Sequence, residues 1–258
     1  MKPASEATLP ILLKSLCLPT FAREYVSAAV QAQRQGLSHE AYLLALAEQE
    51  ASERTQRRVE RLLLESKLPR DKSFATFKES RLPPKARAAL APLRDGAFLD
   101  QAINLVVIGN PGTGKSHLLA GLGQELVRMG RTVLFSPTFQ LVQRLLAAKR
   151  DLRLAAELKR LDRFEALILD DLGYVQQSRE EMEVLFTLVA ERYERRAILI
   201  TTNLVFSKWD QIFKDPMTTA AAIDRIVHHS VIIELPIESY RAEAAKGRAA
   251  NTKPSAAR

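Results

Sequence analysis

Residues 105–116 read LVVIGNPGTGKS, and no other stretch of the chain says as much about its fold. Four apolar residues suited to a strand come first, a glycine-rich bend follows, and Lys115-Ser116 opens a pattern of helical spacing. Glycines let backbone N–H groups converge on an anion at close range, and the N-terminus of the following helix adds partial positive charge. The stretch therefore predicts a phosphate-binding loop between a buried strand and a helix.

The bend from Gly109 to Ser116 matches the Walker A pattern of nucleotide-binding loops. We expect the Lys115 ammonium to reach the β- and γ-phosphates and the Ser116 hydroxyl to bind Mg²⁺. Glycine-rich turns also join strands to helices without a ligand, but the Lys-Ser pair favours a nucleotide, ATP. The side chain of His117 is expected to pack or to face solvent. The candidate nucleotide-binding residues here are Gly109, Asn110, Pro111, Gly112, Thr113, Gly114, Lys115, Ser116 and His117.

A pair of acids, Asp170 and Asp171, follows the apolar run Ala166–Leu169. Ligands of open parallel sheets bind at the carboxyl ends of the strands, where these acids would lie. We expect Asp170 to hold Mg²⁺ through water and Asp171 to orient or polarise the attacking water. The alternative is a pair of solvated acids that cap the next helix.

A third apolar run, Ile198–Ile200, ends in Thr201-Thr202-Asn203. The Asn203 amide is expected to hydrogen-bond the γ-phosphate or its attacking water, and so to sense whether that phosphate is present. Thr and Asn are also common where a strand simply passes into a loop, and this alternative stays open.

Strand-like runs alternate with helical patterns from residue 103 onward, which predicts an α/β fold with a parallel five-stranded sheet flanked by helices. The runs are Ile103–Ile108, Thr132–Phe135, Ala166–Leu169, Ala197–Ile200 and Val231–Leu235. The region before them carries helical spacing only. We therefore expect an all-helical N-terminal domain over residues 1–70, a nucleotide-binding domain with a leading linker over residues 71–241, and a basic flexible tail over residues 242–258.

Composition narrows the class of protein further. The chain of 258 residues is 47% hydrophobic and 26% charged, which excludes wholesale disorder. One cysteine excludes an internal disulfide and fits a reducing cytoplasm, and no apolar run approaches the ~18 residues of a membrane span. The net charge of +8 favours polyanionic partners such as nucleic acid.

Three basic segments are candidates for contact with DNA. The arginines of the first, residues 54–61, are nearly balanced by Glu50, Glu53 and Glu60, with a surplus of one positive charge. A self-paired helix face is therefore as good an interpretation as a phosphate-binding ridge. The second, residues 149–163, has a surplus of three positive charges and is preferred. The third, the tail, would add a non-specific electrostatic contribution. None carries interleaved aromatic residues that would stack on single strands, so we expect duplex DNA.

Together these motifs resemble the AAA+ ATPases, and three further runs narrow the resemblance. These are Leu169–Tyr174, Ala222–His229 and Glu238–Arg241. They are similar to the IstB-like transposition helper proteins of bacterial insertion sequences and, more loosely, to DnaC-type helicase loaders. The N-terminal half, with its Leu18-Pro19 pair, resembles the IstB pattern too.

The resemblance implies roles for residues outside the Walker motifs. Arg225 stands where AAA+ proteins carry an arginine finger that reaches a neighbouring subunit's nucleotide; the alternative is an internal ion pair with Asp224 or another acid. Arg241 resembles a lid or sensor arginine that contacts the nucleotide. Most AAA+ proteins have Glu where this chain has Asp171, and weak or partner-stimulated hydrolysis is therefore expected. The expected catalytic set is Asp171, Lys115, Asn203 and Arg225, with Ser116 and Asp170 at the metal.

By this resemblance we expect a cytoplasmic ATPase that uses ATP and Mg²⁺ and helps a transposase. It would assemble as an oligomer on duplex target DNA, with the cognate transposase as partner and no membrane contact. A helicase loader and a nucleotide-gated DNA-binding module with negligible turnover are the alternatives. A small-molecule P-loop kinase is disfavoured by the basic surface and by the segment around Arg225.

Overall fold

The computed structural model describes residues 4–173, 178–213 and 215–240, with side chains from residue 8 onward. The strands are β1 (Asn104–Gly109), β2 (Val133–Pro137), β3 (Ala166–Leu172), β4 (Ala197–Thr202) and β5 (Ser230–Leu235). The α-helices are α1 (Ala4–Ser15), α2 (Pro19–Gln35), α3 (His39–Ser66), α4 (Pro84–Leu90), α5 (Ala97–Asp100), α6 (Lys115–Arg128), α7 (Thr138–Arg150), α8 (Leu154–Asp162), α9 (Arg179–Arg192), α10 (Asp210–Phe213) and α11 (Pro216–Val227). Short 3₁₀ helices are η1 (Glu79–Arg81), η2 (Ala91–Leu93) and η3 (Phe206–Lys208).

All strands pair in parallel in one five-stranded sheet of order β2-β3-β4-β1-β5, which confirms the predicted architecture. β1 lies between β4 and β5, with Leu105 opposite Leu199 on one side and Val231 on the other. The carboxyl ends of β3, β4 and β1 are consequently neighbours at one edge of the sheet.

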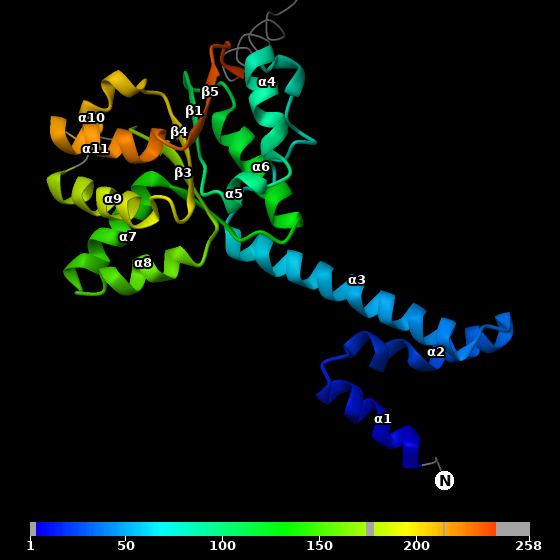
Figure 1. The fold of residues 1–258 in the computed structure, drawn as a ribbon. Helices are drawn as coiled ribbons and strands as arrows, with labels where there is room; N and C mark the ends of the chain where they lie inside the picture. The colour runs from blue at the N-terminus through cyan, green and yellow to red at the C-terminus, as the bar shows by residue number, and fades with distance from the viewer. Residues whose placement is uncertain (1–3, 174–177, 214, 241–258) are drawn as a thin grey trace, which may run out of the picture. The chain divides into compact units, whose positions relative to one another are not determined.

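Helices cover both faces of the sheet and create two separate cores (Figure 1). Successive strand residues point to opposite faces, so Leu105 and Val107 belong to the core under α4 and α6, while Val106 and Ile108 belong to the core under α7 and α9. Because both faces are covered, the strands read as continuous apolar runs rather than as alternating ones. As continuous apolar runs, these strands could be recognised in the sequence.

The stretch before β1, where a leading linker was expected, contains α4, α5 and the short helices η1 and η2, and several of its apolar side chains are buried. Leu82, Leu90 and Phe98 are 5% exposed or less, and all three belong to the core that includes α6. The helices of this segment are short, but their apolar residues still pack into the core on one face of the sheet. This segment is thus packed against the sheet and α6.

The first 61 residues form a compact unit of their own, and residues from Leu62 onward form the other. Within the first unit, Gly36 ends α2 in the left-handed conformation, at φ 66°, and Ser38 Oγ accepts a hydrogen bond from the Ala41 N–H. Burial would raise the pKa of Glu50, but hydrogen bonds from Thr20 and the nearby Arg57 charge lower it overall. The predicted domain boundary at residue 70 stays a prediction.

A buried arginine joins three parts of the second unit. The Arg192 side chain is 2% exposed, and its guanidinium donates hydrogen bonds to the carbonyls of Leu161 (3.0 Å), Phe164 (2.9 Å) and Ala197 (3.0 Å). Burial lowers its pKa to about 10. The side chain thereby connects the end of α8, the turn before β3 and the start of β4.

We expect Arg192→Leu to lower the free energy of unfolding by about 3 kcal/mol, because it leaves buried carbonyls without donors. Urea unfolding measures the change. Arg195→Leu is the matched control: Arg195 is largely exposed and pairs with Asp162 at 2.9 Å, so its loss should cost about 1 kcal/mol or less. Equal unfolding midpoints for the two variants would contradict the role given to Arg192.

Candidate functional site

The glycine-rich loop between β1 and α6 has the backbone geometry that the sequence predicted. Gly112 and Gly114 adopt left-handed conformations, with φ values of 81° and 90°. At Gly109 a Cβ would lie 2.9 Å from the Leu235 carbonyl oxygen, so any side chain would force the loop away from β5. Helix α6 begins at Lys115, directly after the loop.

The Lys115 side chain is held by the loop itself. Only 6% of Lys115 is exposed, and its Nζ donates hydrogen bonds to the carbonyls of Gly109 (2.8 Å) and Asn110 (3.0 Å). The buried Thr113 hydroxyl donates to the same Asn110 carbonyl at 2.9 Å. Gly109, Asn110 and Thr113 thus brace the loop from behind rather than lining the space in front of it.

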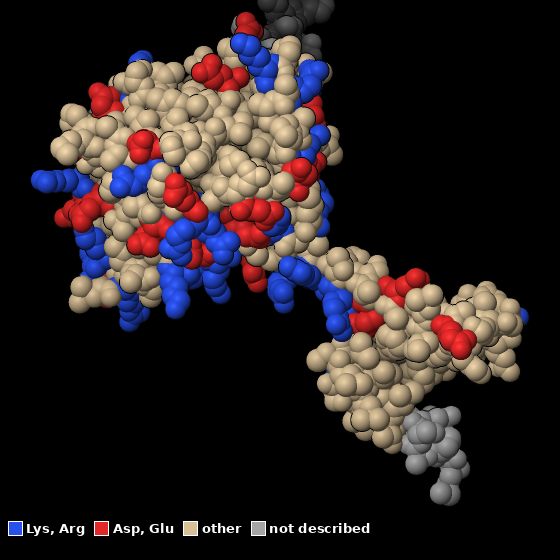
Figure 2. Space-filling view, viewed as in Figure 1, with Lys and Arg blue, Asp and Glu red and all other residues tan. Residues whose placement is uncertain are grey.

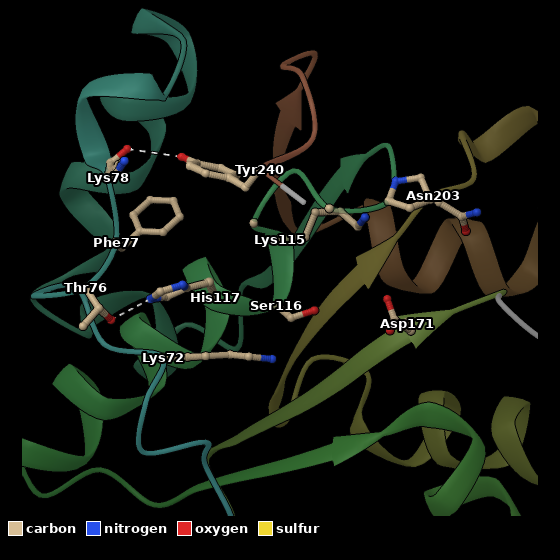
Figure 3. Close-up of a pocket in the computed structure, with 13 residues that line it drawn as sticks. Lys72, Thr76, Phe77, Lys78, Lys115, Ser116, His117, Asp171, Asn203 and Tyr240 are labelled. Atoms are coloured by element: carbon tan, nitrogen blue, oxygen red, sulfur yellow. Dashed lines mark hydrogen bonds between the residues drawn. The ribbon is translucent and has the colours of Figure 1, made fainter. Parts of the chain in front are cut away.

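In front of the loop lies a cavity of about 590 Å³, shown in Figure 3. Its volume is in the range of small-molecule sites. The structure brings together here eight residues named from the sequence: Pro111, Gly112, Gly114, Lys115, Ser116, His117, Asp171 and Asn203.

The two acids at the end of β3 have different surroundings. Asp170 is 9% exposed, and its Oδ1 accepts a hydrogen bond of 2.6 Å from the Thr201 hydroxyl on β4. Asp171 lines the cavity in a left-handed conformation (φ 59°), and its N–H donates to the Thr201 hydroxyl oxygen at 2.8 Å. An irregularity in the pairing of β3 with β4 begins after Leu169. Thr201 therefore positions both acids, and Ser178 rather than either of them caps α9.

Asn203 lies immediately beyond the end of β4, and its exposed side chain lines the cavity. The strand order explains why it meets Asp171 and Lys115. Because β4 stands between β3 and β1, residues that follow these three strands gather at the same edge.

Five further residues line the cavity that sequence reasoning did not assign to it: Lys72, Thr76, Phe77, Lys78 and Tyr240. The Tyr240 N–H donates to the Gly112 carbonyl at 2.9 Å, and its ring and that of Phe77 lie close to Gly114. Tyr240 belongs to a run that carried the family resemblance, which was a usable signal. Nothing local in the sequence marks Lys72 or Phe77.

The family model for IstB-like ATP-binding proteins matches residues 11–248. The chain belongs to the IstB-like family. A Sinorhizobium fredii protein described as an insertion-sequence ATP-binding protein is 44% identical over 241 residues, which cover 93% of this chain and 81% of that relative. The ATP-binding protein of insertion sequence IS21 from Pseudomonas aeruginosa is 34% identical, over 90% of this chain and 88% of its own.

Solved structures show the same fold for this IstB-like protein. DnaI aligns with a TM-score of 0.55 at 20% identity and covers 66% of this chain and 95% of its own. The DnaC helicase loader aligns with a TM-score of 0.51 at 18% identity, over 64% of this chain and 97% of its own. The predicted P-loop fold of the AAA+ type is confirmed.

Arg225 of the IstB-like chain does not line the cavity of its own subunit. It lies on α11, where a guanidinium nitrogen donates to the Ala221 carbonyl at 3.1 Å and the group stands 5.0 Å from the centre of the Phe186 ring. Within the described ranges no acid pairs with it, so the alternative of an ion pair with Asp224 is not what the structure has. Arg241 and the tail lie outside the described residues.

The preferred basic segment of this IstB-like protein, residues 149–163, runs from the last residues of α7 through the turn and α8 to Arg163. Figure 2 shows Lys and Arg side chains projecting from the part of the surface where Figure 1 places α8. Lys149, Arg150 and Arg160 pair with glutamates. No acid among the described residues pairs with the other three cations, Arg153, Lys159 and Arg163. Across those same residues, no helix combines the length and the apolar character needed to cross a bilayer.

Proposed function

We propose that this IstB-like protein is an ATP-dependent DNA-binding helper of a transposase that assembles on duplex DNA and hydrolyses ATP. The observation that carries the proposal is the cavity in which Lys115, Ser116, Asp171 and Asn203 meet. The curated relatives that are described as insertion-sequence ATP-binding proteins supply the biological context.

The residues around the cavity favour one orientation of a bound triphosphate. Loop N–H groups and the N-terminus of α6 would hold the phosphates, and Lys115 would exchange its two carbonyl contacts for phosphate oxygens. Phe77 and Tyr240 offer aromatic faces for the base near Gly114. Adenine stacking on these rings would explain why they border the loop.

The oxygen atoms at this edge of the sheet fit Mg²⁺, which prefers hydroxyl, carboxylate and water ligands. Ser116 would hold the ion directly, and Asp170 would do so through water. A bound Mg²⁺ supplies charge neutralisation on the phosphates. Asp171, which faces the cavity, would orient the attacking water, and Asn203 would hydrogen-bond that water or the γ-phosphate.

The position of Arg225 supports assembly into an oligomer. Because it lies outside its own cavity, it would complete the site of a neighbouring subunit, and ATP would thereby favour an oligomer. Arg153, Lys159 and Arg163, which lie on α8 and at its two ends and have no acidic partner among the described residues, would then contact the phosphates of duplex DNA.

Turnover of ATP, measured with and without duplex DNA and the cognate transposase, tests this function. We expect duplex DNA to raise turnover and the transposase to change it further, because assembly brings Arg225 to the neighbouring site. Lys115→Ala should abolish turnover under every condition. Full turnover in that variant would rule out the mechanism, and capture of a replicative helicase in place of a transposase would redirect the function to helicase loading.

The salt dependence of the affinity for duplex DNA tests which basic segment contacts the DNA. Replacing Arg153, Lys159 and Arg163 together by Ala should reduce the slope of log affinity against log salt concentration by about three, roughly one per lost phosphate contact. The matched comparison is the triple replacement of Arg54, Arg58 and Arg61 by Ala in the N-terminal unit. If only the variant that lacks Arg54, Arg58 and Arg61 shows a smaller slope, the DNA surface lies on α3 instead.

A further inference from the structure

The segment of residues 69–76, here called the strap, lies against one face of α6. His117, Gly121 and Gln124 are spaced four and three residues apart, so they share that face. A Cβ at Gly121 would lie 3.2 Å from the backbone nitrogen of Phe74, which shows how closely the strap approaches the helix. Glycine at this position permits the contact.

Two side chains of α6 hold the strap by its backbone. Gln124 is 5% exposed, and its Nε2 donates to the carbonyls of Pro69 (2.7 Å) and Lys72 (3.2 Å). Nε2 of His117 lies 2.9 Å from the Ser73 carbonyl oxygen, which requires that nitrogen to carry the proton and donate. The backbone on both sides of the Lys72 side chain is therefore anchored to the helix that begins at the phosphate loop.

The strap also holds its own shape. The Thr76 hydroxyl is within hydrogen-bond distance of the Asp71 carbonyl (2.9 Å) and the Ser73 carbonyl (3.0 Å). The Phe74 ring packs edge-on against Phe77, with ring centres 6.1 Å apart, and lies 4.2 Å from the Arg94 guanidinium. None of these contacts involves the Lys72 side chain.

The Lys72 side chain points from the strap into the nucleotide cavity, below Ser116 and toward the side of Asp171 (Figure 3). No described residue makes an ion pair or hydrogen bond with its ammonium. The Lys115 ammonium, in contrast, already has two carbonyl partners. The cavity is thus lined by two lysines besides Lys115, Lys72 and Lys78, and of these Lys72 is the one whose backbone is anchored to α6.

We propose that the Lys72 ammonium binds the phosphate tail of the nucleotide as a second cation beside Lys115. The proposal rests on the proposed ATP site and names a contact in it. Phosphate is the favoured partner because Lys72 shares its part of the cavity with Ser116, whereas the aromatic rings of Phe77 and Tyr240 border the loop at Gly114. A charge-assisted contact of this kind is worth ~1.5 kcal/mol, or roughly tenfold in affinity.

Equilibrium binding of MgATP and of inorganic tripolyphosphate to the full chain tests the contact. We expect Lys72→Gln to weaken both ligands about tenfold, because both carry the phosphate chain, and Lys72→Arg to restore most of the affinity. Lys85→Gln is the matched control, since Lys85 is exposed on α4 and does not line the cavity. The strap should survive the substitution, because Gln124 binds the Lys72 carbonyl and not its side chain; an unchanged melting temperature checks this.

Unchanged affinity for both ligands in Lys72→Gln would overturn the proposal. So would a loss for ATP with none for tripolyphosphate, because the contact would then be to the base or the ribose. Lys115→Ala separates this outcome from failure of the site itself. If Lys115→Ala also leaves ATP affinity unchanged, the proposed nucleotide site is wrong. If Lys115→Ala weakens ATP binding and Lys72→Gln does not, the nucleotide site is retained and the Lys72 contact with phosphate is wrong.

Discussion

The Arg225→Ala variant is expected to bind ATP with nearly normal affinity and to turn it over about a thousandfold or more slowly. An arginine that reaches a phosphoryl group from a neighbouring subunit contributes roughly three to five orders of magnitude in rate. Arg225 lies outside its own cavity and has no acidic partner among the described residues, so its charge is available to a second subunit. Its removal should spare the residues that hold the nucleotide.

The measurement is ATP turnover in the presence of duplex DNA, together with nucleotide affinity. Arg195→Ala is the control, because Arg195 is an exposed arginine that follows α9 and pairs with Asp162 and Glu191. The melting temperature of Arg225→Ala shows whether loss of the contact with Phe186 destabilises the fold, and we expect it to change little. If Arg225 acts between subunits, a mixture of Arg225→Ala and Asp171→Asn should regain turnover. In the mixture, an Arg225→Ala subunit supplies an intact Asp171 and its Asp171→Asn neighbour supplies an intact Arg225.

Two results would contradict this role. Turnover by Arg225→Ala at the rate of the unmodified chain would show that the arginine does not act on the phosphates. Loss of turnover without rescue in the mixture would place its effect within its own subunit, through the contacts on α11.

The Asp171→Asn variant is expected to retain ATP binding and to lose turnover by about two to four orders of magnitude. A side chain that takes or orients a proton in the reaction contributes a factor of this size. Asn has nearly the same shape as Asp and tolerates the left-handed conformation observed at this position, φ 59°, so the backbone should not change. The variant therefore tests the charge alone.

The turnover number and the ATP dissociation constant, measured separately, check this expectation. Asp170→Asn is the comparison: its carboxylate is bonded to Thr201 and would hold Mg²⁺ through water, so this variant should require more Mg²⁺ for the same rate. If the unmodified chain shows no turnover under any condition, Asp171 has no catalytic role and the protein is a nucleotide-gated binding module.

Local patterns in the sequence were sufficient to predict which residues would meet in the candidate site. The glycines of the loop, Lys115 and Ser116 lie within eight consecutive residues, so covalent spacing alone arranges them on a bend that opens a helix. Asp171 and Asn203 could be placed at the same edge because each follows an apolar strand, and parallel strands share their carboxyl edge. The alternation of strand-like runs with helical patterns also predicted a parallel sheet flanked by helices.

Only the tertiary structure decided how distant segments meet at this site. The order β3-β4-β1 places Thr201 where it bonds Asp170 and Asp171, and no local pattern in the sequence distinguishes this threonine from Thr202. Lys72 reaches the cavity because Gln124, fifty-two residues later, binds its carbonyl. Such contacts depend on the packing of the whole chain, whereas sequence patterns report only the neighbours along one helix or strand.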